Sequence, residues 1–198
     1  CINQLRTEPL EAVLMRLLSK SSEVRLAHEV RFLCEIVKAG LDRLNISYNT
    51  MLEIVRLLHP RPVVSGETIF ASGDQEFFVV FHGELTVKKI HGSEMPAVNT
   101  DLSSGSCFGV RSLLLWNRRP SPTVALKNSV LGILDYKSFR SILYPGLRRN
   151  HQEKLAFFRG IPYLSGIDPN LLSEISYCCK THRYNPQHII FHQVQHQK

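Results

Sequence analysis

Apolar side chains recur at helical spacing through the first 58 residues. Three stripes show this period: Leu10, Val13, Leu14, Leu17 and Leu18; then Leu26, Val30, Leu33 and Val37; then Met51, Ile54, Val55 and Leu58. Residues three and four positions apart share one face of a helix, so each stripe predicts an amphipathic helix. Thr7 is expected to cap the first helix, and Ser22 and Gly40 are expected to bound the second. His59-Pro60 predicts the end of the third.

The pattern changes after residue 62, where short β-branched and aromatic runs alternate with polar turns that contain glycine. The runs that predict strands are residues 68–70, 77–81, 85–90, 124–126 and 130–134. Gly73, Gly83 and Gly92 stand in the turns between them. Several short strands at this spacing favour a small antiparallel barrel or roll.

Helical periodicity returns at Tyr136 and continues past an expected break at Pro145-Gly146. The predicted fold class is therefore α+β: N-terminal helices, an antiparallel β-roll and C-terminal helices. The chain also repeats itself after a shift of 120 residues, without a gap. The matched pairs are Gly40 with Gly160, Leu41 with Ile161, Leu44 with Leu164, Met51 with Leu171, Leu52 with Leu172, Val55 with Ile175 and Ile69 with Ile189. This register predicts a helix over 171–178 and the start of a second domain.

Composition narrows the class of protein. Of the 198 residues, 43% are hydrophobic and 21% are charged, which is typical of a globular protein. No apolar run approaches the roughly 18 residues of a membrane span, so none is expected. The five cysteines are odd in number and have no framework spacing. They favour reduced thiols and a cytoplasmic location.

The net charge of +7 raises the question of a nucleic-acid partner. The basic residues are scattered, however, and no aromatic platform interleaves with the arginine pairs Arg118-Arg119 and Arg148-Arg149. We therefore expect solvated surfaces and no nucleic-acid partner. His188, His192 and His196 recur every fourth residue, but Ile189 to Phe191 favours a strand, so no metal site is predicted. No nucleophile elbow or catalytic carboxylate pair is present, so no enzyme is expected.

Four stretches together resemble a known family. They are "SGETIFASGD" (65–74), "FFVVFHGELTV" (77–87), "GSCFGVRSLLLWNRRPSPTV" (105–124), and "DYKSFRSIL" followed later by "FFRGIPYLSGI". In this order they are similar to the tandem cyclic nucleotide-binding domains of cAMP-dependent protein kinase regulatory subunits. The resemblance covers residues 40–198 and implies a cyclic nucleotide-binding-like domain at 40–156 and the helices and first strand of a second such domain at 157–198. Residues 1–39 lie outside it, and their apolar stripes predict an N-terminal helical extension. Another β-roll, such as a cupin-like barrel, is the alternative.

The third stretch stands where the family has its phosphate-binding cassette. There, an acid just after Phe-Gly accepts from the ribose hydroxyl and an arginine pairs with the phosphate. This sequence keeps Phe108 and Gly109 but has Val110 at the acid position and Pro120 at the arginine position. The residues that the resemblance assigns to the cassette are Phe108, Gly109, Val110, Arg111, Ser112, Leu113, Arg119, Pro120, Ser121, Pro122 and Thr123.

These departures predict a degenerate cassette with weak or no cAMP binding. The resemblance implies a non-catalytic regulatory or scaffold module, without a cofactor, that contacts a protein partner through its exit helices at 136–160. The alternative is a working cAMP or cGMP sensor in which Arg111 or Arg119 replaces the missing arginine. Ser121 follows Arg118-Arg119-Pro120 and is a candidate phosphorylation site, although so short a motif also arises by coincidence.

Overall fold

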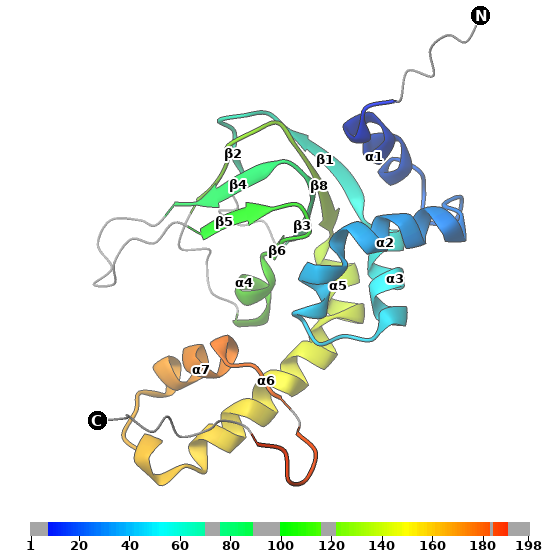
Figure 1. The fold of residues 1–198 in the computed structure, drawn as a ribbon. Helices are drawn as coiled ribbons and strands as arrows, with labels where there is room; N and C mark the ends of the chain where they lie inside the picture. The colour runs from blue at the N-terminus through cyan, green and yellow to red at the C-terminus, as the bar shows by residue number, and fades with distance from the viewer. Residues whose placement is uncertain (1–7, 70–75, 89–99, 116–121, 183, 190–198) are drawn as a thin grey trace, which may run out of the picture. The chain divides into compact units, whose positions relative to one another are not determined.

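The computed structural model describes residues 8–69, 76–88, 100–115, 122–182 and 184–189. The chain divides into two compact units, Cys1–Asn150 and His151–Lys198 (Figure 1). The first unit contains, in order, α1 (Leu10–Leu18), α2 (Ala27–Asp42), α3 (Tyr48–Leu57), β1 (His59–Val63), β2 (Thr68–Ile69), β3 (Phe77–His82), β4 (Glu84–Val87), β5 (Thr100–Ser103), β6 (Cys107–Phe108), α4 (Val110–Leu115), β7 (Thr123–Ala125), β8 (Ser129–Leu134), α5 (Tyr136–Ile142) and the start of α6 (Tyr144–Arg159).

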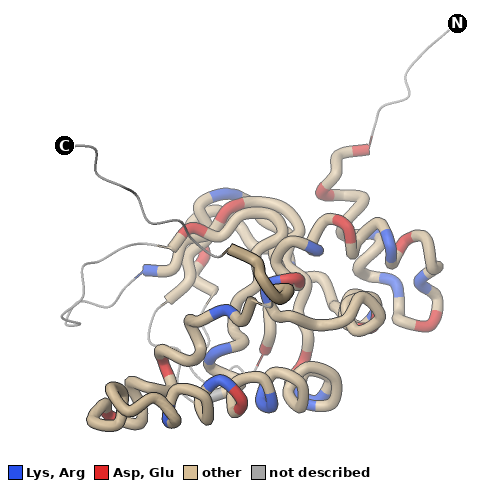
Figure 2. Tube along the Cα trace, turned by 60° about the horizontal axis from the view of Figure 1, so that its bottom comes forward, with Lys and Arg blue, Asp and Glu red and all other residues tan. Residues whose placement is uncertain are grey.

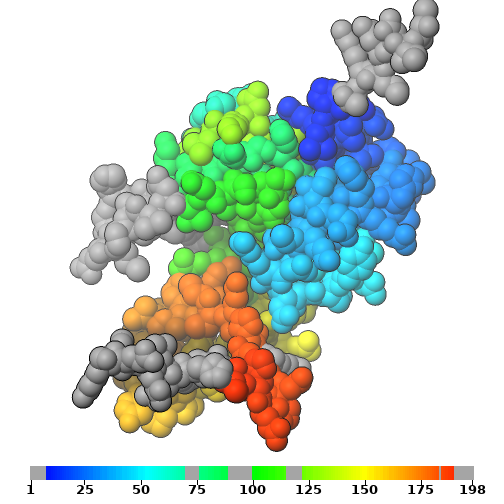
Figure 3. Space-filling view, in the orientation of Figure 1, coloured from blue at the N-terminus to red at the C-terminus, as the bar shows by residue number. Residues whose placement is uncertain are grey.

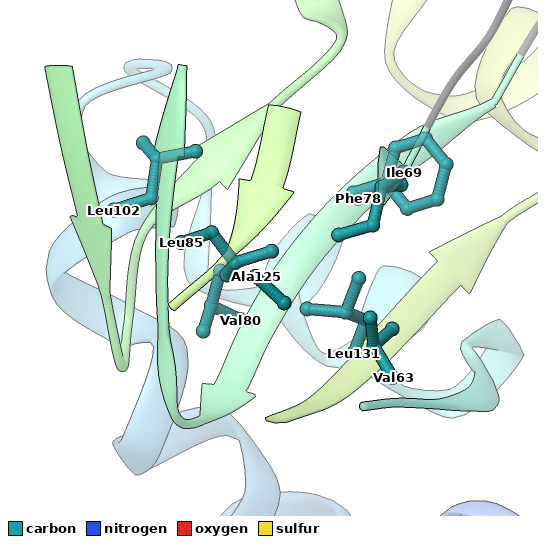
Figure 4. Packing of buried hydrophobic residues seen from close by; sticks show 8 residues of the cluster. All are labelled: Val63, Ile69, Phe78, Val80, Leu85, Leu102, Ala125 and Leu131. Atoms are coloured by element: carbon teal, nitrogen blue, oxygen red, sulfur yellow. The ribbon is translucent and has the colours of Figure 1, made fainter. Parts of the chain in front are cut away.

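The strands form two antiparallel four-stranded sheets, in the orders β1-β8-β3-β6 and β2-β7-β4-β5. Both sheets contribute to one apolar cluster (Figure 4). Its buried members are Val63, Ile69, Phe78, Val80, Leu85, Leu102, Ala125 and Leu131. The predicted α+β class with an antiparallel roll is therefore confirmed.

The segment His59-Pro60-Arg61-Pro62 ends α3, as predicted, but it then forms most of a strand that the sequence did not predict. β1 pairs with β8 alone and stands at the edge of its sheet. Proline cannot donate to a strand ladder, and an edge strand tolerates this because one side of it has no neighbouring strand. The strands β5 and β6 were also not predicted.

The N-terminal helices pack on the roll, in agreement with the burial that their apolar stripes require. α1 contacts β1 and β8, and α2 contacts α3 and β3. In Figure 3 the blue N-terminal helices lie directly against the green strands. The buried guanidinium of Arg25 joins α1 to α3, because it donates to the carbonyls of Leu18 (2.9 Å) and Val55 (2.6 Å), among others. Basic groups at helix C-termini satisfy carbonyls that have no partner inside the helix.

The predicted boundaries of α1 and α2 need correction. α1 has Pro9 at its N-cap, and Thr7 lies outside the described residues. α2 starts at Ala27, where the Glu29 carboxylate accepts from the backbone N–H of Leu26 (2.9 Å), so Ser22 does not cap it.

Gly40 does not end α2, which continues to Asp42. A Cβ at Gly40 would collide with the carbonyl oxygen of Gly105, closer than real Cβ atoms approach. Gly40 therefore lets the helix lie against the loop that leads into β6.

The expected break at Pro145-Gly146 is also wrong, because both residues lie in the first turn of α6. Proline fits there because the first backbone N–H groups of a helix have no intrahelical partner. The interruption falls at Leu143, the C-cap of α5.

The second unit contains the remainder of α6, a 3-10 turn η1 (Pro162–Leu164) and α7 (Pro169–Cys178). Asp168 caps α7 by accepting from the N–H groups of Asn170 and Leu171. Residues 171–178 are thus helical, as the 120-residue register predicts. That a second roll-type domain begins here stays a prediction, and part of its expected first strand lies outside the described residues.

Charged positions are spread over the described helices and strands (Figure 2). None of the described helices is both long and apolar enough to cross a membrane.

Candidate functional site

The cassette segment links the two sheets of the roll. It leaves the first sheet at β6, forms α4, and enters the second sheet at β7. Gly109 joins β6 to α4 with a φ of 96°, a left-handed conformation that favours glycine. Phe108 and Gly109 thus form a turn that leads directly into the short helix α4.

The first end of the cassette is held by β3. Phe108 pairs with Phe78, and their rings stack at 4.8 Å between centroids with an interplanar angle of 8°. Phe78 belongs to the apolar cluster inside the roll, and Phe108 packs against it. The preceding loop is fixed by the N–H of Gly105, which donates to the carbonyl of Val80 (2.8 Å). Phe108 is thus a wall of the roll interior at the start of α4.

The buried side of α4 is apolar. Val110, Leu113 and Leu114 lie at helical spacing and are each less than a tenth exposed, with Val110 at 5%. By contrast, Arg111 is exposed and Ser112 is half-buried. Val110, which stands at the position of the family's ribose-binding acid, is therefore one of the buried side chains that pack α4 against the rest of the domain.

The second end of the cassette is fixed between β2 and β4. Thr123 is buried and pairs with Ile69 and Val87. Residues directly opposite in an antiparallel pair have their side chains on the same face, and both partners border the apolar cluster. Thr123 therefore faces the roll interior, as Phe108 does. The carbonyl of Pro122 accepts from the N–H of Lys88 (2.9 Å), which continues this pairing.

Three predicted cassette residues, Arg119, Pro120 and Ser121, lie outside the described residues, as does Arg118. In the described part of the site, Phe108 and Thr123 therefore both face the interior of the roll. Val110 and Leu113 belong to the buried face of α4.

Cys107, next to Phe108, is not a reactive thiol. Burial raises its pKa to about 12, although the charge of Arg43 acts in the opposite direction. A thiol with so high a pKa stays protonated near neutral pH, and the thiolate is the nucleophile and metal ligand. Among the residues that the structure describes, no group of three or more histidines, cysteines and acidic residues is placed to hold a metal ion.

One candidate site was missed in the sequence. On α5 and α6 the guanidinium of Arg140 lies over the rings of Tyr136 (5.9 Å) and Tyr144 (5.5 Å), and that of Arg148 lies over Tyr144 (5.7 Å). We call these four residues the tyrosine–arginine ladder. The expectation that no aromatic platform interleaves with the arginine pairs therefore needs correction at Arg148-Arg149, because Arg148 lies over the ring of Tyr144. The signal was the four-residue spacing of tyrosine and arginine, which places them on one helical stripe.

Comparison with known proteins agrees with this architecture. Residues 60–144 match the cyclic nucleotide-binding domain family. The chain is 30% identical over 127 residues to a cAMP-dependent protein kinase regulatory subunit of Blastocladiella emersonii, covering 63% of this chain and 32% of that protein. The chain thus spans about a third of the length of this curated relative.

Solved structures show the same fold. A cAMP-bound PfPKA-R has a TM-score of 0.58 at 21% identity, with 77% of this chain and 55% of that chain covered. The regulatory subunit of a cAMP-independent protein kinase A from Trypanosoma cruzi, bound to guanosine, has a TM-score of 0.57 at 13% identity, with 84% and 59% covered. Residues 60–144 therefore form a cyclic nucleotide-binding domain, and the chain resembles the regulatory subunits of cAMP-dependent protein kinase.

Proposed function

We propose that this chain is a non-catalytic regulatory or scaffold module whose cyclic nucleotide-binding domain binds cAMP weakly or not at all. The observation that carries the proposal is Val110. An apolar side chain occupies the position of the family's acid, and it is packed in the buried stripe of α4 with Leu113 and Leu114. Such a side chain offers no acceptor to a ribose hydroxyl.

The sequence adds a second loss, because Pro120 stands at the position of the phosphate-binding arginine. A hydrogen bond to a charged group contributes about 1.5–3 kcal/mol. Loss of both groups therefore costs about 3–6 kcal/mol, or roughly two to four decades in affinity. We expect the remaining wall, Phe108 and Thr123, to leave a weak site.

The alternative is a working sensor with a rewired pocket. The retained Phe-Gly turn, the inward-facing Thr123 and the exposed Arg111 on α4 favour it. The ligand could also differ from cAMP, since the Trypanosoma cruzi relative is bound to guanosine, which has no phosphate. The identity with that protein is only 13%, so it supports a test and not an assignment.

In this proposal the exit helices, 136–160, form the surface for a protein partner. The relatives are regulatory subunits, which supports such a role. We further propose that α6, η1 and α7 are the first helices of a second domain of the same kind. Asp168 caps a 10-residue helix here, as Ser47 caps the 10-residue α3 in the first domain.

Calorimetric titration of the folded chain with cAMP, cGMP and guanosine tests the proposal. We expect no binding near micromolar affinity for any of the three. Micromolar or tighter binding of a cyclic nucleotide would favour the sensor, and binding of guanosine alone would favour a nucleoside site.

A rescue variant tests the named causes. Val110→Glu with Pro120→Arg restores the acid and the arginine, so we expect it to gain more cAMP affinity than either change alone, because both groups act on one ligand. Val110→Gln with Pro120→Gln is the matched control without the charges. Because Val110 is buried, near-ultraviolet circular dichroism must first show that each variant folds. A folded double variant that still does not bind would contradict these causes and would indicate that Arg111 or Pro122 blocks the pocket.

A further inference from the structure

In the tyrosine–arginine ladder of α5 and α6 the two arginines are exposed and the two tyrosines are half-buried, and the orientation of this stripe is fixed. Phe139, Leu143 and Leu147 precede three of its members by one residue and are buried. Phe139 packs on Phe77 of β3, with 6.1 Å between ring centroids. This buried stripe holds the helices, so that Arg140 and Arg148 remain exposed beside it.

The guanidinium groups of the ladder are positioned before any ligand arrives. Arg140 also donates to the hydroxyl of Tyr136 (2.8 Å), and it lies over the ring of Tyr144. The guanidinium of Arg148 also lies over the ring of Tyr144. An arginine held on aromatic rings has lost part of its rotamer freedom already, so less entropy remains to be lost on binding.

The charge of this segment has one sign. Residues 136–149 contain Lys137, Arg140, Arg148 and Arg149 and no aspartate or glutamate. The side chain of Asp135, just before them, accepts from the N–H of Ser138 (3.0 Å) and caps α5. The stripe therefore complements an anionic partner.

We propose that the tyrosine–arginine ladder binds an extended, acidic segment of a protein partner. This rests on the proposed role of the exit helices and adds the chemistry of what they bind. The guanidinium carbons of Arg140 and Arg148 lie 5.5 Å and 5.7 Å from the centroid of the Tyr144 ring, so they are at most about 11 Å apart. Carboxylates four residues apart in an extended chain are about 13 Å apart. Each arginine can therefore take one carboxylate, with the paired geometry that guanidinium and carboxylate groups favour.

Two other anionic partners fit less well. Nucleic-acid bases stack on open aromatic faces, whereas guanidinium groups already lie over the faces of Tyr136 and Tyr144. A membrane surface requires exposed apolar side chains beside the basic ones. In residues 136–149, all of which the structure describes, the large aliphatic and phenylalanine side chains are buried or half-buried.

The test is fluorescence anisotropy with a labelled peptide of repeated Glu-Glu-Ser-Gly units, in which a pair of glutamates recurs every fourth residue. Its glutamine version is the control peptide. We expect Arg140→Gln with Arg148→Gln to weaken binding of the glutamate peptide by about tenfold or more, since each charged hydrogen bond contributes about 1.5–3 kcal/mol, where 1.4 kcal/mol is tenfold. Arg31→Gln with Lys38→Gln removes the same charge from exposed positions of α2 and should change affinity less than about twofold, because distant surface charges are screened.

Tyr144 provides a second, graded test. Tyr144→Phe keeps the ring and should bind as the wild type does, whereas Tyr144→Leu should weaken binding about twofold to fivefold, the range expected from an exposed cation–π contact. Amide shifts in nitrogen-15 spectra should be confined to residues 136–149.

Equal losses of peptide affinity in the ladder and α2 variants would overturn the proposal. Amide chemical-shift changes outside residues 136–149 on peptide binding would overturn it as well. Absence of glutamate-peptide binding would also overturn it, as would tighter binding of an oligothymidine or of phosphatidylserine vesicles. These titrations use nucleotide-free protein, so their failure would leave the calorimetric result on the cassette unaffected.

Discussion

The helix pair α2–α3 and the helix pair α6–α7 have the same lengths but different surroundings. Each is a 16-residue helix followed by a 10-residue helix. The 120-residue register matches Met51 of α3 with Leu171 of α7, yet Met51 is 3% exposed and Leu171 is 55% exposed. Val55 is buried, whereas its counterpart Ile175 is half-buried.

The difference in exposure between α3 and α7 shows that the signals that form a helix are distinct from the contacts that bury its apolar face. Both 10-residue helices begin at a side-chain cap, Ser47 or Asp168, and both carry apolar residues at helical spacing. These signals are local and act in both places. Burial of the apolar face depends on what packs against it, and α3 packs on α2 and α5 beside the strands of the roll. The two-domain proposal expects a second roll to cover the matching face of α7.

The largest effect should come from the matched pair Met51 and Leu171. We expect Met51→Ala to lower the free energy of unfolding by about 2–5 kcal/mol, because it empties a buried position. Leu171→Ala should change it by less than about 0.5 kcal/mol, since this exposed side chain fills no such space. Urea denaturation followed by circular dichroism measures both. Similar losses would show that the face of α7 is covered after all.

A second matched pair, Gly40 and Gly160, should give a smaller effect. Gly40→Ala forces a Cβ against the backbone of Gly105 and should cost about 1–3 kcal/mol, as overpacking does. At Gly160 a Cβ would lie 3.3 Å from the carbonyl oxygen of Phe157, a tight approach but no collision, so Gly160→Ala should cost less than Gly40→Ala, about 1 kcal/mol or less. The same denaturation assay compares the two variants. If Gly40→Ala did not lower the free energy of unfolding, the close approach of α2 to the loop that leads into β6 would be contradicted.

The smallest effect concerns pH and the second unit. His151 on α6 joins α7, with its Nε2 3.1 Å from the Ser173 hydroxyl and its Nδ1 3.2 Å from that of Ser176. The Ser176 hydroxyl donates to the Ser173 carbonyl, so it accepts from Nδ1. Burial lowers the pKa of His151, the charge of Lys154 adds to this, and Glu174 acts in the opposite direction.

A lowered pKa means that the unfolded chain binds the proton more readily than the folded one. The contribution of His151 to stability is therefore complete above about pH 6.5 and is lost as pH falls through the lowered pKa. Protection of the α7 amides, corrected for intrinsic exchange, should fall between pH 7.5 and 5. In His151→Gln this fall should be absent, and an unchanged pH response in that variant would refute the assignment.

The sequence was sufficient for elements whose signals are local. The helical stripes and the apolar runs of β3 and β8 gave structure close to what was predicted. The sequence did not predict those strands that depend on pairing with a segment far along the chain. β1 contains two prolines and exists because β8 supplies the pairing, and β6 is two residues long and is defined by its register with β3.

The candidate site shows the same division. Phe108 and Gly109 stand in the turn before α4 and Thr123 stands in β7, but the sequence did not reveal that Val110 belongs to the buried stripe of α4. Gly40 was interpreted as a helix end because its contact with Gly105, 65 positions along the chain, cannot be read locally. The tyrosine–arginine ladder was missed because Pro145-Gly146 was taken as a break that would interrupt the stripe.

The central claim, a cassette too weak for ordinary cAMP signalling, is tested most directly by the thermal unfolding midpoint of the wild-type chain with and without 1 mM cAMP. A ligand at a thousand times its dissociation constant stabilises the folded state by about 4 kcal/mol, which corresponds to a rise of roughly 8–16 °C in a domain of this size. A ligand at its dissociation constant adds only about 0.4 kcal/mol. The account predicts a rise below about 2 °C; a rise of 8 °C or more would contradict it.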